Sequence, residues 1–135
     1  MIENLKNTDQ LINSELSSKV LKSVIENNEL LIEIGANDLL EVVQFLKSNE
    51  KLKFRQLVDI AGVDYPDEEK RFSLIYLFLS HEKNNRIKLS IKFEINQVIN
   101  SITKIFPSAN WMEREVFDMY GIKFKNHPDL RRILT

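Results

Sequence analysis

Ionisable side chains that could support chemistry are concentrated near the C-terminal end of the sequence. They are Glu113, Arg114, Glu115, Asp118, His127, Asp129, Arg131 and Arg132. If this stretch is helical, Glu115 lies three residues before Asp118 and both carboxylates share one face. Such a pair, with His127 nearby, could exchange protons with a substrate or bind a divalent metal ion. One hypothesis is therefore a carboxylate-dependent hydrolase.

Arg114 favours a structural explanation of the same carboxylates. It lies four residues before Asp118, so an ion pair can form across one helical turn. The adjacent positive charge would neutralise an acid–base pair, and charged side chains mostly lie at the surface. We therefore expect a surface helix whose core face carries Met112, Val116 and Met119.

The residues from Lys123 onward are mainly basic. Four basic side chains stand against one acid, Asp129, which gives a local charge of +3 on a chain of net charge −1. A nucleic-acid patch is one explanation, although Phe124 alone is available for stacking, and a solvated tail is another. Docking onto an acidic protein surface explains these residues better, because each of the two arginines can form a forked contact with a carboxylate. The predicted docking residues are Glu113, Arg114, Glu115, Asp118, His127, Pro128, Arg131 and Arg132.

Composition excludes several classes of protein. The 135 residues predict one domain, and the near-neutral charge argues against a protein that coats nucleic acid or anionic lipid. There is no cysteine, so this chain cannot hold an iron–sulfur cluster or a structural zinc through thiolates. Three glycines are too few for a phosphate-binding glycine loop, and the apolar run 74–79 is too short to cross a bilayer.

The elements that must position these residues follow from hydrophobic periodicity. The first elements predicted are a flexible segment over 1–13, a helix over 14–27 and a strand over 30–34. Asn37 then caps a second helix, whose core face carries Leu39, Leu40, Val43 and Leu46. Within 54–64 we predict one turn followed by a strand.

A hairpin is the clearest pattern in the sequence. Strands over 71–80 and 86–93 flank a polar turn. The outgoing strand is apolar on both faces, with Ile75, Leu77 and Leu79 opposite its core residues. Two explanations stay open: a strand covered by a helix or by the chain's own tail, or an interface with a partner protein.

Two helices complete the prediction. The first spans 95–106 and ends before Pro107, and the second spans about 108–121 and ends at Gly121. The order of elements predicts an α+β fold: a two-layer sandwich of one mostly antiparallel or mixed sheet with helices packed on one face. Residues 14–135 would form this single domain.

Several blocks of the sequence resemble one family. Residues 113–124 and 127–134 are similar to the signature of the C subunit of NADH:quinone oxidoreductase, the 30-kDa subunit of respiratory complex I, and residues 57–66 and 106–111 agree in order and spacing. The resemblance covers about residues 54 to 135. Further motif positions to which it assigns a structural role are Asp59, Gly62, Asp64, Tyr65, Trp111 and Gly121.

The resemblance implies a non-redox subunit of the peripheral arm that braces the hydrogenase-like 49-kDa (D) subunit beside the cluster-bearing B subunit. The complex would pass electrons from NADH through FMN and iron–sulfur clusters to a quinone such as ubiquinone, coupled to ion translocation. All of these cofactors would belong to partner chains, and the isolated chain would have no activity, no nucleic-acid partner and only indirect membrane contact. An equivalent module of a membrane-bound hydrogenase is the alternative.

The resemblance also sets expectations about the ends of the chain. Family members usually continue beyond the block 131–134 with an extended segment that embraces the partner, whereas this sequence ends at Thr135. We therefore expect a truncated chain. Its start has no transit peptide, which fits a bacterial protein on the cytoplasmic side of the inner membrane.

Overall fold

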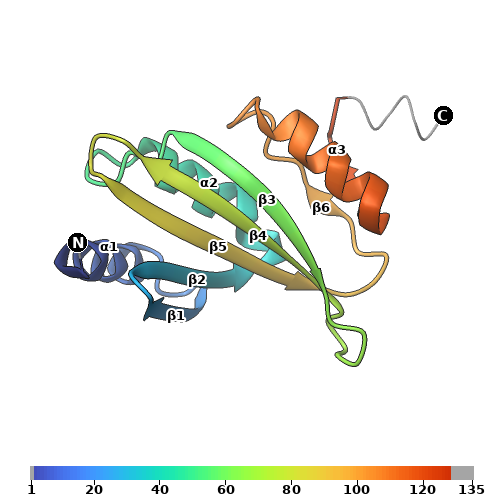
Figure 1. Cartoon of the computed structure of the whole chain (residues 1–135), viewed down its shortest axis with the longest axis horizontal. Coiled ribbons are helices and arrows are strands. Elements are labelled where there is room, and N and C mark those ends of the chain that lie inside the picture. The colour runs from blue at the N-terminus through green and yellow to red at the C-terminus, as the bar shows by residue number, and fades with distance from the viewer. Residues whose placement is uncertain (1, 129–135) are drawn as a thin grey trace.

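A five-stranded mixed sheet with helices on one face forms the body of the protein (Figure 1). The computed structural model describes residues 2–128. Its elements are α1 (Ile2–Glu15), β1 (Val20–Glu26), β2 (Glu29–Gly35), η1 (a 3-10 helix, Ala36–Asp38), α2 (Leu39–Ser48), β3 (Gln56–Asp64), β4 (Phe72–Ser80), β5 (Asn85–Phe93), β6 (Ile99–Asn100), α3 (Ala109–Tyr120) and β7 (Phe124–Lys125). The strand order is β1-β2-β5-β4-β3, and only β2 and β5 pair in parallel. The predicted fold class is confirmed.

One face of the sheet forms the core. In the register, Ile32 lies beside Leu89, and Leu89 beside Tyr76. All three side chains are 0% exposed, as alternation along half-buried strands requires. Leu5 of α1 and Leu46 of α2 belong to the same buried cluster, so both helices pack on this face.

The N-terminal segment forms a helix that the sequence pattern does not predict. Residues 2–13, predicted to be flexible, belong to α1, whose Leu5 and Ile12 are 2% and 0% exposed. Between them, Thr8 is buried and accepts a hydrogen bond from Asn85 Nδ2 at 2.6 Å. The helix therefore packs through two apolar residues two turns apart, a pattern too sparse to stand out among polar neighbours.

The helix predicted over residues 14–27 is wrong. After α1 the chain forms β1 and returns as β2 through Asn27 and Asn28, whose φ angles are 52° and 63°. Left-handed backbone at both central positions is what a tight two-residue hairpin needs, and asparagine tolerates it. The strand predicted over 30–34 is confirmed as part of β2.

The helix predicted after Asn37 is confirmed as α2, but its start and its buried side differ. A 3-10 turn over Ala36–Asp38 precedes it, and Asp38 stands at the N-cap without a side-chain capping bond. Val42 is buried, whereas Leu40 is 37% exposed. Leu39, Val43 and Leu46 are buried as predicted, and Val42 takes the place of Leu40 on the core side.

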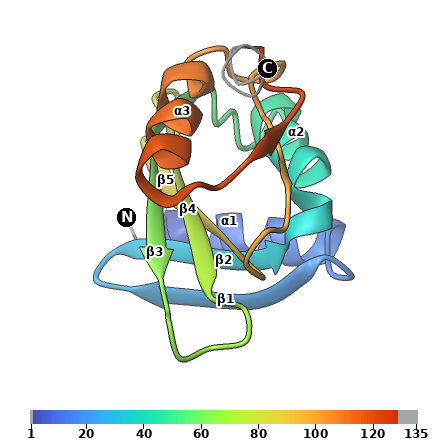
Figure 2. The ribbon, with the colours of Figure 1, turned by 90° about the vertical axis from the view of Figure 1, so that its right-hand side faces the viewer.

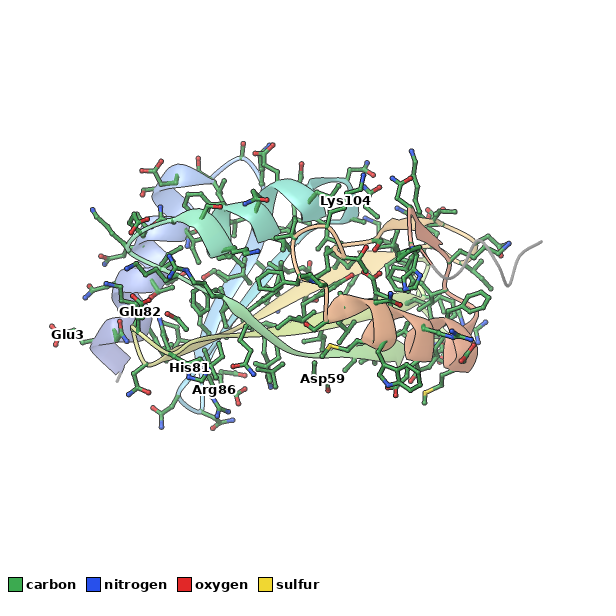
Figure 3. The ribbon with its side chains drawn as sticks, turned by 90° about the horizontal axis from the view of Figure 1, so that it is seen from above. Glu3, Asp59, His81, Glu82, Arg86 and Lys104 are labelled. Carbon is green, nitrogen blue, oxygen red and sulfur yellow. The ribbon has the colours of Figure 1, made fainter. Side chains whose placement is uncertain are left out.

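The predicted hairpin is confirmed as β4 and β5, and the predicted strand within 54–64 as β3. Figure 1 looks onto the sheet face opposite α2, and no helix of residues 2–128 crosses in front of β3–β5 there. Ile75, Leu77 and Leu79 on this face are half-buried. Asp59, which is paired with Leu77, points away from α2 in Figure 3.

The helix predicted over 95–106 is wrong. Residues 99–100 form the short strand β6, which pairs in parallel with β7. Figure 2 shows this segment running between α2 and α3, and Lys47 Nζ of α2 donates a hydrogen bond to the Ile105 carbonyl at 2.6 Å. Ile95 and Val98, which recur at helical spacing, are 55% and 51% exposed. Among the described residues, no helix is both long and apolar enough to cross a membrane.

Candidate functional site on helix α3

Helix α3 contains half of the predicted docking residues, and its position in the sequence is confirmed. It spans Ala109–Tyr120 and ends at Gly121, whose φ of 72° is left-handed. The Gly121 N–H donates to the Phe117 carbonyl at 2.8 Å, so glycine closes the last turn as predicted. Ser108 stands at the N-cap without a side-chain capping bond.

The side of α3 that faces the core differs in part from the prediction. Val116 is buried and Met112 packs against the core as predicted, whereas Met119 is 73% exposed, and Ala109 and Glu113 are buried instead. The helix is therefore rotated relative to the apolar stripe of the sequence, and a carboxylate takes the place of an apolar side chain. The buried side is referred to below as the inner side of α3.

The Glu113 carboxylate joins α3 to the loop after β6. The Ser101 hydroxyl donates to Glu113 Oε1 at 2.6 Å, and the Ile102 backbone N–H donates to Oε2 at 2.9 Å. Burial raises the pKa of Glu113 to about 7, although both hydrogen bonds oppose this shift. Glu113 is 0% exposed, so its side chain does not lie at the surface, where the docking prediction would place it.

His127 lies against the same buried side. Its Nε2 is 2.8 Å from the Asn110 carbonyl and 3.9 Å from Glu113 Oε1. The carbonyl can only accept, so the Nε2 nitrogen donates to it, and this contact holds the chain after β7 against the first turn of α3. His127 is 1% exposed, so its side chain is also not at the predicted docking surface.

Tyr76 of β4 is a further polar group in this part of the core. Its hydroxyl is buried and has no hydrogen-bond partner within the described part of the chain. Burial, and secondarily the charge of Glu113, raises the pKa of Tyr76 well above its ordinary value. The core beneath α3 therefore contains both a carboxylate and a phenol.

Tyr120 fixes the other end of α3 to β3. Its hydroxyl donates to the Gly62 carbonyl at 3.0 Å. A Cβ atom at residue 62 would lie 2.6 Å from the Tyr120 ring, so only glycine fits without displacement. The close approach of helix and strand explains the glycine at this motif position.

The remaining motif residues on β3 and its following loop lie at the surface or nearly so. Asp59 accepts a hydrogen bond from the Ile60 N–H. Asp64 forms a bidentate ion pair with Arg71 at 2.7 and 3.1 Å, and hydrogen bonding to Arg71 lowers the pKa of Asp64. Lys92 Nζ lies 5.5 Å from the centre of the Tyr65 ring.

The opposite side of α3 is exposed. We define the outer side as Trp111, Glu115, Asp118 and Met119. Trp111 is 66% exposed and Met119 is 73% exposed. Among the ion pairs of residues 2–128, none joins the half-buried Arg114 to Asp118, so the predicted pair does not form.

The hydrolase hypothesis assigns the chemistry to Glu115 and Asp118, helped by His127. The structure separates them, because His127 is buried with Glu113 on the inner side whereas both carboxylates face solvent on the outer side. Pro128 is exposed, and Asp129, Arg131 and Arg132 lie outside the described residues.

The sequence did not predict the contact of Ser101 with Glu113 or that of Tyr120 with Gly62. It also did not predict that Tyr76 lies in the core near Glu113. Ser101 and Thr103 interrupt the apolar pattern of 95–106, and such residues are poor helix formers that bond readily to nearby backbone. That interruption indicates a loop rich in hydrogen-bond donors. Nothing in the sequence pairs Gly62 with Tyr120, because the contact spans 58 residues.

Comparison with known proteins identifies relatives of the whole chain. Residues 32–135 match the family described as "Respiratory-chain NADH dehydrogenase, 30 Kd subunit". The C subunit of the NADH-quinone oxidoreductase of Ruegeria pomeroyi is 50% identical over 107 residues, 79% of this chain and 54% of that protein. The C subunit of the same enzyme from Chelativorans sp. is 42% identical over 135 residues, 100% of this chain and 68% of that protein. The chain thus spans between about half and two thirds of these relatives.

Two solved structures share the fold. One is described as "Nqo5 of the trypsin-resistant fragment (1-134) in P63 form", with a TM-score of 0.77, 23% identity, and coverage of 93% of this chain and 98% of that one. The other belongs to the membrane-bound sulfane sulfur reductase, an archaeal respiratory membrane complex, with a TM-score of 0.78, 17% identity, and coverage of 90% and 71%.

Proposed function

The chain belongs to the family of the 30-kDa subunit of respiratory-chain NADH dehydrogenase, and we propose that it is a structural subunit without a redox group in the peripheral arm of a NADH:quinone oxidoreductase. It braces the hydrogenase-like 49-kDa (D) subunit beside the cluster-bearing B subunit. FMN, iron–sulfur clusters and quinone are held by partner chains, and the complex works at the cytoplasmic side of a bacterial inner membrane.

The division of α3 into two sides is the observation that carries this proposal. Hydrogen bonds of Glu113 and Tyr120 hold the inner side against two distant parts of the chain. The outer side presents Trp111 and Met119 to solvent, although large apolar side chains of this kind are typical of interface cores. A helix held firmly in place with an exposed apolar outer side is suited to docking, and the sequence contains no cysteine for cluster ligation.

A module of a membrane-bound hydrogenase-type complex is the second candidate. The likeness to the sulfane sulfur reductase supports it by fold alone, and that likeness is as close as the one to the Nqo5 fragment. Sequence identity to the relatives from NADH-quinone oxidoreductases favours the quinone oxidoreductase. Neighbouring genes for quinone-oxidoreductase subunits, rather than for nickel-hydrogenase maturation, would agree with this preference.

Co-expression tests the proposal directly. The tagged chain is produced together with the hydrogenase-like subunit encoded beside it, and size exclusion with mass spectrometry identifies what elutes together. We expect a stable one-to-one complex. Separate elution of two folded proteins would contradict the bracing role.

Spectroscopy and metal analysis test the assignment of the cofactors. The chain purified alone should show no flavin or cluster absorption and contain no stoichiometric iron. Iron or flavin that co-purifies with the isolated chain at one equivalent would overturn the non-redox assignment.

A further inference from the structure

We propose that the outer side of α3 inserts Trp111 into an apolar pocket with a basic rim on the hydrogenase-like partner subunit. This inference rests on the proposed function and adds to it a surface and the chemistry of the partner. The proposed partner is a single protein surface, which this helix would contact through one aromatic anchor and the two carboxylates that follow it.

Trp111 is the anchor because the fold leaves it exposed. It is 66% exposed in the first turn of α3, and no aromatic contact within the described chain involves its ring. Met119 is 73% exposed eight residues later, about 80° further round the helix, so it flanks Trp111 on the exposed part of α3. Tryptophan is enriched among the residues that dominate binding energy, and methionine adapts to irregular apolar surfaces.

The carboxylates beside the anchor determine the charge of the partner. Glu115 and Asp118 follow Trp111 at spacings of four and seven, so the three side chains lie along one stripe. No ion pair within residues 2–128 includes either acid. Cationic groups around a pocket for Trp111 would complement both charges.

The position of Asp118 supports the same conclusion. It lies in the last turn of α3, where the helix dipole disfavours negative charge, and that turn contains no basic residue. Glu115 and Asp118 are also like charges three residues apart, which repel each other. A basic partner would relieve both of these unfavourable interactions.

The inner side keeps the anchor in place. Glu113 binds the loop after β6, and Tyr120 binds β3, so both halves of the helix are fixed before docking. Little backbone has to become ordered when the partner binds. The entropic cost of binding is therefore small, and more of the free energy gained from the contact remains as affinity.

Binding of outer-side variants to the co-expressed hydrogenase-like subunit tests this inference. We expect Trp111→Ala to weaken the complex by about 30-fold, as for a central anchor. The double variant Glu115→Gln with Asp118→Asn should weaken it by about tenfold and reduce the salt dependence of the dissociation constant. Met119→Ala, at a neighbouring exposed position of α3, gives a second apolar test and should also weaken the complex.

Matched controls are available on β1, at the opposite edge of the sheet from β3. Leu21→Ala removes a side chain that is 63% exposed, and Glu26→Gln removes an exposed carboxylate. Both should bind like the wild type. Circular dichroism and melting temperature establish that each variant is folded.

The outcomes separate the two proposals. If the wild type binds and the folded Trp111 and Met119 variants bind equally well, the docking surface is wrong but the bracing role stands. Tighter binding of the double charge variant would show an acidic partner surface and overturn the charge assignment. If the wild type does not bind at all, both proposals fail.

Discussion

The two sides of α3 use the same kind of side chain for opposite purposes. Glu113 on the inner side is 0% exposed and accepts two hydrogen bonds from the loop after β6. Glu115 and Asp118 on the outer side are exposed and take part in no ion pair among the described residues. Within six residues of sequence, one acid therefore serves the fold and two are left for contacts outside the chain.

The difference is set by position on the helix rather than by charge. A carboxylate loses its hydration when it is buried, and only hydrogen bonds or a cation can offset that loss. The two hydrogen bonds to Glu113 offset only part of this loss of hydration, so its pKa still rises to about 7. The outer acids remain hydrated, so they can be removed at little cost to stability.

Alanine at the inner and the outer position should give the largest contrast. At pH 5, Glu113→Ala should lower the free energy of unfolding by about 3–4 kcal/mol, because it leaves the buried Ile102 N–H without an acceptor, removes the hydrogen bond from Ser101 and opens a cavity. Glu115→Ala should change stability by less than about 0.5 kcal/mol. Urea denaturation of both variants measures the difference, and equal losses would remove the distinction between the two sides.

The pH dependence of stability should follow Glu113. Its ordinary pKa is 4.5 and its folded pKa is about 7. A raised pKa means that the folded state retains the proton longer, so stability present below pH 4.5 is lost as the pH rises to about 7. The full loss corresponds to about 3 kcal/mol.

Glu113→Gln is the matched control for this effect. The amide oxygen can accept from Ile102, its NH2 group can donate to Ser101, and it does not titrate. The variant should melt at nearly the same temperature from pH 5 to pH 8, while the wild type loses stability over that interval. Asp64 and Glu82, whose pKa values are lowered by hydrogen bonds from Arg71 and Lys53, act in the opposite sense and only below pH about 4.5. A wild type that melts at one temperature across pH 5–8 would contradict the proposed cause.

The contrast also shows how far the sequence could predict this molecule. Strands β4 and β5 were predictable because β4 is a nine-residue run of mostly apolar residues and β5 alternates polar and apolar residues from Arg86 to Phe93, with a polar turn between them. Helix α3 was predictable from its length and its closing glycine. Its rotation was not, because the periodicity treats Glu113 as a surface residue, and only the donors of a distant loop make its burial possible.

Elements with weak local patterns were predicted less well. Ile95 and Val98 recur at helical spacing but are exposed in a loop, where pairing of β6 with β7 overrides the local pattern. Residues 20–26 carry apolar residues that fit either a helix or a strand. Asn27 and Asn28 favour the hairpin, because asparagine tolerates the left-handed backbone that its turn requires. Docking by residues 131 and 132 stays a prediction.

The contact between α3 and β3 should give an intermediate effect. Gly62→Ala places a Cβ atom 2.6 Å from the Tyr120 ring, so the ring must move and its hydrogen bond to residue 62 weakens. We expect a loss of about 2 kcal/mol in the free energy of unfolding. Gly35→Ala is the control, because its Cβ atom would lie 3.5 Å from Asp38 Oδ2, an ordinary contact. Equal destabilisation by both alanines would argue against a close approach at residue 62.

The smallest effect should have the opposite sign. Asp118→Asn removes a negative charge from the last turn of α3 and from its repulsion with Glu115, so the isolated domain should melt about 1–2 °C higher. The gain should shrink in high salt, because exposed charges are screened. Differential scanning calorimetry at low and high salt measures both effects. A lower melting temperature would mean that Asp118 stabilises the fold. The outer side of α3 would then contribute to stability, contrary to the distinction between the two sides. A higher melting temperature together with weaker docking would show that this acid serves the contact at the expense of the helix.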